Sequence, residues 1–134
     1  PLLGICLGMQ LLADSGEEGG ITEGLGLVPG RVMRLTAAAR KRIPHVGWND
    51  VNALKDAALF EGIPDGADFY FVHSYHFVPA EATTGLASTD YCGKFISAVS
   101  CGCVFGVQFH PEKSSRHGLR LLRNFLAIRG GDAC

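Results

Sequence analysis

Gly4-Ile5-Cys6-Leu7-Gly8 is the stretch of this sequence that decides the fold. Apolar residues precede it and favour a strand, and the helix-forming run 9–13 follows it, so the stretch predicts a sharp turn between a strand and a helix. At such an elbow the central residue is strained and its neighbours must leave room, so we expect side chains at Gly4 and Gly8 to collide with the turn. Cys6 would then project from the backbone toward a ligand.

The helix expected after Cys6 bears on the chemistry of its sulfur. Its unpaired N–H groups and the positive end of its dipole point toward the sulfur, which favours thiolate over thiol. The N–H of Leu7 is also placed to donate to a negatively charged oxygen formed beside the sulfur. A buried cysteine between two structural glycines is the alternative that this motif alone leaves open.

A second motif, Gly106-Val107-Gln108-Phe109-His110-Pro111-Glu112, lies near the other end of the chain. Apolar and other residues alternate over 104–109, which predicts a half-buried strand, and Pro111 ends it just after His110. Glu112 can then reach the imidazole nitrogen that faces away from the sulfur and fix the tautomer. The alternative, a loop histidine beside a surface carboxylate, is disfavoured by the elbow cysteine.

Both motifs, in this order, resemble those of the class I (triad) glutamine amidotransferases, and the resemblance extends over residues 4–125. It implies a catalytic triad of Cys6, His110 and Glu112, with glutamine as substrate, Leu7 as an oxyanion donor, and neither a cofactor nor a metal ion. It also implies an α/β fold, in which a doubly wound, mostly parallel sheet has helices on both faces.

Three further strings resemble one subfamily, the glutaminase subunits of imidazole glycerol phosphate synthase in histidine biosynthesis: G-L-G-L-V-P-G at 24–30, P-H-V-G-W-N at 44–49 and F-Y-F-V-H-S-Y at 69–75. This resemblance implies a heterodimer in which ammonia passes to a cyclase subunit, a TIM barrel. Two alternatives stay open. One is another class I amidotransferase, serving anthranilate, GMP or CTP synthesis. The other is a non-catalytic fragment that only binds a partner.

The resemblance also implies which residues hold the amino-acid end of glutamine: backbone groups of His73, Ser74 and Tyr75, the amide of Gln10 and the carboxylate of Glu18. A polar run at the end of an apolar strand lies where a doubly wound sheet binds ligands. For Gln10 and Glu18, solvated surface is the alternative.

Trp48, Tyr70 and Lys113 are the candidates for the interface with the cyclase. Trp48 could instead be a core aromatic residue, and Lys113 could be ordinary surface. Phe69 and Phe71 are expected on one buried strand face.

Composition favours a cytoplasmic enzyme. The chain has 134 residues, a net charge of -1 and 47% hydrophobic residues, which suits one core and argues against a nucleic-acid surface. No apolar run reaches membrane-spanning length and no signal peptide is visible. The five cysteines fit a reducing compartment. Cys101 and Cys103 flank a glycine that suggests a hairpin turn rather than a metal site, whereas Cys92 and Cys134 have no assigned role.

Alternating segments give the expected architecture. A strand over 1–5 and a helix over 7–14 precede a loop over 15–24, strand-like pieces within 25–35 and a polar connection over 37–42. Further strands are expected over 69–75, 83–89, 95–100 and 104–109. The final helix is expected from Ser114 onward, with two opposite faces. Its apolar face is made by Leu119, Leu122, Phe125 and Leu126, and its basic face by Arg116, Arg120 and Arg123.

The start of the chain is unusual for this fold. Pro1 lies only a few residues before the elbow, whereas a doubly wound sheet needs further parallel strands beside the nucleophile strand. We therefore expect residues 1–134 to form a single, incomplete glutamine amidotransferase domain, a C-terminal fragment without its N-terminal strands and the loop that lends a second oxyanion donor.

Overall fold

Two strands from opposite ends of the sequence lie side by side in the computed structural model, which describes residues 1–38 and 41–130. β1 (Leu2–Ile5) pairs in parallel with β10 (Val104–Val107), and Ile5 lies opposite Val107. Because the carboxyl ends of parallel strands meet at one edge of a sheet, the residues after β1 and after β10 come together. Those residues are the elbow and the H-P-E motif.

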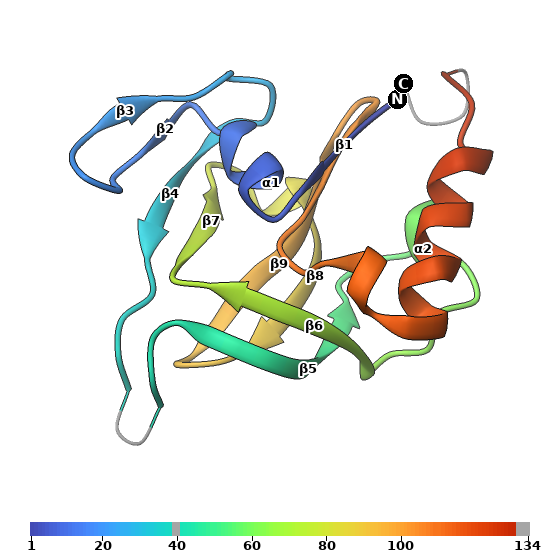
Figure 1. Ribbon diagram of the computed structural model, residues 1–134. Coiled ribbons are helices and arrows are strands. Elements are labelled where there is room, and N and C mark those ends of the chain that lie inside the picture. Colours follow the sequence, from blue (N-terminus) through green and yellow to red (C-terminus); the bar gives the residue numbers. More distant parts are fainter. Residues whose placement is uncertain (39–40, 131–134) are drawn as a thin grey trace.

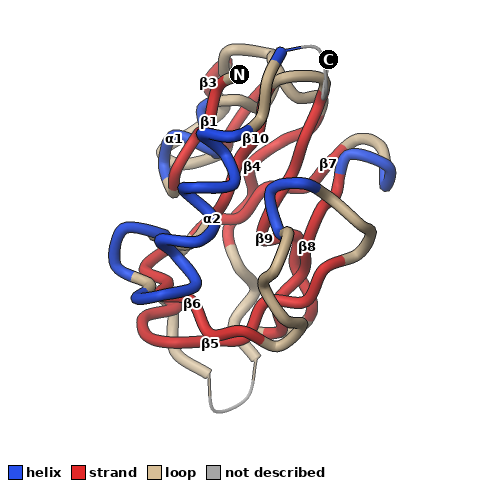
Figure 2. The backbone as a smooth tube through the Cα atoms, turned by 90° about the vertical axis from the view of Figure 1, so that its right-hand side faces the viewer, coloured by secondary structure: helices blue, strands red, loops and turns tan. Residues whose placement is uncertain are grey.

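The other strands extend this pair into one mixed sheet, whose main path runs in the order β3-β2-β4-β7-β9-β8-β5-β6, with β10 paired to β9 and β1 to β10. These strands are β2 (Ser15–Gly16), β3 (Thr22–Glu23), β4 (Gly30–Arg34), β5 (His45–Ala53), β6 (Ala67–His73), β7 (Tyr75–Pro79), β8 (Gly85–Asp90) and β9 (Lys94–Cys101). Figures 1 and 2 both place β5 and β6 together at the end of the molecule opposite β1.

The pairing within the described residues is mostly antiparallel, where we expected a mostly parallel sheet. Only β1–β10 and β2–β4 pair in parallel among the strands that the structure describes; the remaining pairs are antiparallel. The reason is that short connections can only join antiparallel neighbours, as in the β8–β9 and β9–β10 turns. The α/β class itself is confirmed.

Helices cover both faces of β10, as expected. On one face α1 (Leu7–Leu11) packs so closely that a Cβ on Gly106 would lie 2.7 Å from Met9 Cγ. On the other face Phe105 and Val107 belong to the same core cluster as Leu121 of α2 (Ser115–Ala127). β10 is therefore buried on both sides, and the prediction of a half-buried strand over 104–109 is wrong: Gln108 is also fully buried.

α2 packs beside β6 and the short 3-10 helix η1 (Ala58–Phe60) (Figure 1). The expected apolar face is confirmed only in part: Leu122 and Phe125 are half-buried, and Phe125 packs against the core. Leu119 and Leu126 are exposed, at 54% and 81%. The buried stripe instead runs through Gly118 and Leu121 to Ile128. Apolar spacing alone could not separate two neighbouring stripes on one helix.

Most of the expected strands are confirmed within a few residues, but β7 was not foreseen and the helix expected over 7–14 ends at Leu11. The expected loop over 15–24 contains β2 and β3, and the nine-residue β5 was not foreseen. β6 buries Phe69 and Phe71 on one face, as predicted. The hairpin at Gly102 is also confirmed, whereas residues 39–40 of the expected polar connection and Cys134 lie outside the described residues.

A further 3-10 helix, η2 (Ala82–Thr84), precedes β8, and η3 (Pro111–Lys113) carries the end of the H-P-E motif. Within the described ranges, every helix is too short or too polar to cross a membrane.

Candidate active site

Cys6 forms the turn between β1 and α1 with a backbone conformation that is rare outside glycine. Its φ is 51° and its ψ is -109°, and its N–H donates to the Val107 carbonyl at 2.8 Å, which fixes the turn against β10. Such a conformation costs about 1–3 kcal/mol and persists only where the surroundings enforce it. The strained elbow expected from the sequence is therefore present.

The two glycines of the elbow differ in their surroundings. A Cβ on Gly4 would lie 2.6 Å from the carbonyl oxygen of Gly8, so a side chain there would displace the backbone of α1. A Cβ on Gly8 would meet no heavy atom within 4 Å among the described residues. The expected collision is confirmed for Gly4 and wrong for Gly8, whose backbone, rather than its missing side chain, makes the close contact.

The Cys6 thiol lies between a donor and an acceptor. Its Sγ is 3.7 Å from the Val72 carbonyl, to which it donates, and 3.7 Å from Nε2 of Gln108, from which it accepts. Burial raises the pKa of Cys6, and the charge of Glu112 adds to that rise, while the N–H of Leu7 and the amide of Gln108 lower it. The N–H of Leu7 at the start of α1 therefore favours the thiolate, as expected, but burial outweighs it and the net shift of the Cys6 pKa is upward.

His110 and Glu112 interact as predicted. Nδ1 of His110 lies 2.7 Å from Oε1 of Glu112, within the range of a charge-assisted hydrogen bond. A carboxylate only accepts, so Nδ1 carries a proton and Nε2 is the nitrogen left to exchange a proton with a thiol. Because the motif follows β10 and Cys6 follows β1, the parallel β1–β10 pair brings His110 and Cys6 to the same edge of the sheet.

The backbone of Tyr70 and the side chain of Ser114 hold the H-P-E turn in place. The N–H of His110 donates to the Tyr70 carbonyl at 2.9 Å, and the Tyr70 N–H donates to Oγ of Ser114 at 2.9 Å. The same buried hydroxyl donates to the His110 carbonyl. The sequence predicted no such role for Ser114, although a serine just before a helix is a recognisable signal.

A cavity of about 180 Å³ contains Cys6 and gathers every residue expected to hold the substrate: Gln10, Glu18, His73, Ser74 and Tyr75, together with Leu7 and Val72. Glu18 is exposed on its rim, whereas the imidazole of His73 is buried, so only backbone groups of His73 remain available to a ligand. Nε2 of Gln10 donates to the Tyr75 carbonyl at 3.0 Å and to Oε1 of Gln108 at 3.2 Å. The side-chain oxygen of Gln10 is therefore its ligand-facing group.

A second cluster lies at the surface beside the triad. Trp48 and Tyr70 are directly opposite each other on β5 and β6, with ring centroids 6.0 Å apart, and Nζ of Lys113 lies 6.0 Å from the Tyr70 ring. Trp48 is 53% exposed, so the alternative of a core aromatic is wrong. The three residues named as interface candidates thus form one cluster, in which Trp48 and Lys113 are exposed and the half-buried Tyr70 links them to the H-P-E turn.

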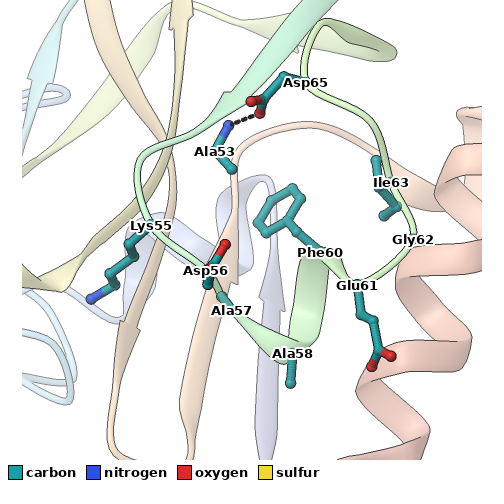
Figure 3. A pocket seen from close by; sticks show the side chains of 10 residues that line it. All are labelled: Ala53, Lys55, Asp56, Ala57, Ala58, Phe60, Glu61, Gly62, Ile63 and Asp65. Atoms are coloured by element: carbon teal, nitrogen blue, oxygen red, sulfur yellow. Dashed lines mark hydrogen bonds between the residues drawn. The ribbon is translucent and has the colours of Figure 1, made fainter.

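A larger cavity, of about 580 Å³, lies between the end of β5 and η1 and contains none of the triad residues (Figure 3). Asp65 on its wall accepts a hydrogen bond from the Ala53 N–H at 2.9 Å, and Lys55, Asp56 and Glu61 also line it. Although this cavity is more than twice as large as the one that contains Cys6, neither Cys6 nor His110 lines it. Among the described residues, no cluster of metal-binding side chains is present.

A strained elbow cysteine and a carboxylate-bound histidine thus follow two paired parallel strands of a mixed sheet. The chain belongs to the class I glutamine amidotransferase family, whose model matches residues 1–128. Its relatives include the imidazole glycerol phosphate synthase subunit HisH of Moorella thermoacetica, 55% identical over 93% of this chain and 59% of that protein. HisH of Pyrococcus furiosus is 53% identical over 93% of this chain and 63% of that protein.

Solved structures agree on the fold. A glutamine amidotransferase from Thermotoga maritima matches with a TM-score of 0.61 and 24% identity, over 95% of this chain and 47% of that one. Compared with the two HisH relatives named above, the chain spans about three fifths of their length. The resemblance to class I amidotransferases stated from the two motifs is confirmed.

Proposed function

We propose that this chain carries the glutamine-hydrolysing site of the HisH subunit of imidazole glycerol phosphate synthase. The observation that carries the proposal is that Cys6, on its strained elbow, and the His110–Glu112 pair follow the adjacent ends of the parallel strands β1 and β10. Identities of 50–55% with HisH proteins select this subfamily among the class I amidotransferases. A free cysteine as nucleophile also suits the reducing cytoplasm as the location.

The reaction that these groups support is acyl transfer through a thioester. Sγ of Cys6 attacks the side-chain carbonyl carbon of glutamine, while Nε2 of His110 takes the thiol proton and passes it to the departing nitrogen as ammonia forms. The negative charge on the carbonyl oxygen is stabilised by the N–H of Leu7. Water then attacks the thioester, with His110 as base, and releases glutamate and the free thiol.

The amino-acid end of glutamine is assigned to the 180 Å³ cavity. Both N–H groups of the Gln10 amide already have protein acceptors. The oxygen of this amide is therefore the group that accepts from the α-ammonium group of glutamine. The backbone of 73–75 completes the cradle, and Glu18 on the rim adds a negative charge that favours the ammonium group.

The test of the proposed function is steady-state kinetics of the full-length gene product with its cyclase. Cys6→Ala and His110→Ala should each remove glutamine-dependent turnover while ammonia-dependent cyclisation survives. Loss of the ammonia-dependent reaction in Cys6→Ala would instead place the cysteine in cyclase chemistry. Glutaminase activity that no cyclase stimulates would favour another class I amidotransferase, and a wild-type protein that binds a cyclase without hydrolysing glutamine would favour a non-catalytic role.

We also propose that Trp48, Tyr70 and Lys113 contact the cyclase, a TIM-barrel subunit, as part of a heterodimer. Support comes from the exposure of Trp48 and Lys113 and from the hydrogen bonds that join the Tyr70 backbone to the His110 turn. Movement of this cluster against a partner would be transmitted to the base.

Lys113→Ala tests this surface, with Lys94→Ala, an exposed lysine on β9, as the matched control. We expect Lys113→Ala to weaken cyclase binding in isothermal titration or to lower the ratio of glutamine-dependent to ammonia-dependent cyclisation. Lys94→Ala should change neither quantity. Unchanged affinity together with unchanged coupling in Lys113→Ala would assign Lys113 to ordinary surface.

A further inference from the structure

A continuous series of hydrogen bonds connects β5 to the sulfur of Cys6. It begins at Asn49 and crosses the buried histidines of β5 and β6. In its first half, Asn49 Nδ2 lies 3.2 Å from His45 Nε2, and His45 Nδ1 lies 2.9 Å from His73 Nε2. The Tyr75 carbonyl then joins the two halves, because it lies 2.8 Å from His73 Nδ1 and 3.0 Å from Gln10 Nε2. In the second half, Gln10 Nε2 lies 3.2 Å from Gln108 Oε1, and Gln108 Nε2 lies 3.7 Å from Cys6 Sγ.

The carbonyl of Tyr75 determines the tautomer of both histidines. A carbonyl only accepts, so Nδ1 of His73 carries a proton and, in the neutral ring, Nε2 accepts. His45 must then donate from Nδ1 and accept at Nε2 from the amide of Asn49. Burial supports the neutral state, since it lowers the pKa of each ring to about 4.

The same carbonyl determines which way the amide of Gln108 points. Gln10 directs one N–H at the Tyr75 carbonyl, and its second N–H requires an acceptor in Gln108. Oε1 of Gln108 therefore faces Gln10, and Nε2 faces the sulfur. Gln108 is 0% exposed, so no water can replace either contact if the amide turns over.

We propose that Gln108 is a positioning residue of the nucleophile: its buried amide holds an N–H against Cys6 Sγ and stabilises the thiolate that attacks the substrate. The His45–His73 pair, acting through Tyr75 and Gln10, keeps that amide in the required orientation. The inference rests on the proposed function for the identity of the substrate, but the reactivity of the sulfur can be measured without any substrate.

Other groups also act on the same sulfur, and the test must separate their effects on the Cys6 pKa from that of Gln108. The N–H of Leu7 and the charge of Lys113 favour the thiolate, whereas burial and the charge of Glu112 oppose it. The Val72 carbonyl accepts from the thiol and so favours the protonated form. Among the described residues, Gln108 is the one that donates a side-chain N–H to this sulfur, so replacing it tests that contact separately from the others.

The test is the rate of alkylation of Cys6 by iodoacetamide as a function of pH, read by peptide mapping of the full-length protein. The exposed Cys101 serves as an internal reference. Gln108→Met keeps the length of the side chain and removes the N–H, and Gln108→Glu presents a carboxylate to the sulfur. Because this contact is long, we take the low end of the free energy of a hydrogen bond to a charged group. Loss of that bond corresponds to a rise of about one unit in the pKa of Cys6.

At neutral pH we expect the ratio of Cys6 to Cys101 alkylation to fall about tenfold in Gln108→Met and further in Gln108→Glu. His73→Leu should lower it in the same direction by a smaller factor. His76→Gln is the matched control, because His76 lies on β7 within the same region but outside the series of hydrogen bonds. Circular dichroism and urea unfolding establish which variants are folded, and the two Gln108 variants decide the matter if His73→Leu does not fold.

An unchanged alkylation ratio in folded Gln108→Met and Gln108→Glu overturns the proposal and would make Gln108 a satisfied core amide. An equal fall in His76→Gln would overturn the role of the His45–His73 pair. A wild-type protein that fails to hydrolyse glutamine would count against the proposed function alone, because the alkylation ratio reports on the sulfur whatever the substrate.

Discussion

Replacing Gly118 with alanine tests whether α2 holds the H-P-E turn in place. A Cβ at this buried position would lie 1.8 Å from the carbonyl oxygen of Pro111 and 2.7 Å from its carbon. Both of these atoms belong to the backbone of Pro111, so no side-chain rotation can relieve the overlap. The helix and the turn must separate by more than an ångström.

Two opposing effects determine the sign of the change in stability. Alanine is favoured over glycine inside a helix by about 1 kcal/mol. The forced overlap costs about 1–3 kcal/mol, and separation of the two elements strains the bonds that Ser114 makes to Tyr70 and His110, each worth about 1 kcal/mol. We expect a net loss of about 1–3 kcal/mol and, because the base shifts, a fall in glutamine turnover of about 100-fold.

Urea unfolding of the full-length protein, followed by tryptophan fluorescence, measures the first quantity, and steady-state glutaminase kinetics measure the second. Gly130→Ala is the control, because a Cβ there would meet no described atom within 4 Å. A Gly118→Ala protein as stable as the wild type, with unchanged kcat, would refute the reasoning and show that α2 does not constrain His110.

Three other results are expected. Glu112→Gln should lower kcat about 10²- to 10⁴-fold, because the 2.7 Å bond to His110 loses its charge; turnover within tenfold of the wild type would contradict a triad. Burial raises the pKa of Cys6 above its ordinary value of 9.0, so its alkylation rate should keep rising above pH 9, and a plateau near neutral pH would contradict this. The pKa values of His45 and His73 are lowered from 6.5 to about 4, so the unfolded chain binds more protons between these pH values; the free energy of unfolding should fall as pH drops from 6.5 toward 4, with a shallower slope in His73→Leu.

The sequence by itself determined the parts of the site that depend on neighbouring residues. The elbow follows from a cysteine between two glycines after an apolar run, and the His110–Glu112 bond spans only two residues. The polar run 73–75 at a strand end marked the cavity wall. In each case a local backbone conformation is sufficient to place the groups, so a linear pattern carries the information.

The tertiary structure alone decided what covers these groups. The parallel pairing of β1 with β10 joins residues about a hundred positions apart, and it buries Gln108 beside Cys6 where alternation suggested an outward-facing polar residue. The protonation preference of the thiol, and the direction of the hydrogen bonds through His45 and His73, likewise come from contacts between distant strands. Desolvation and amide orientation depend on every atom around a group, and most of those atoms are remote in sequence, so no local pattern could have revealed them.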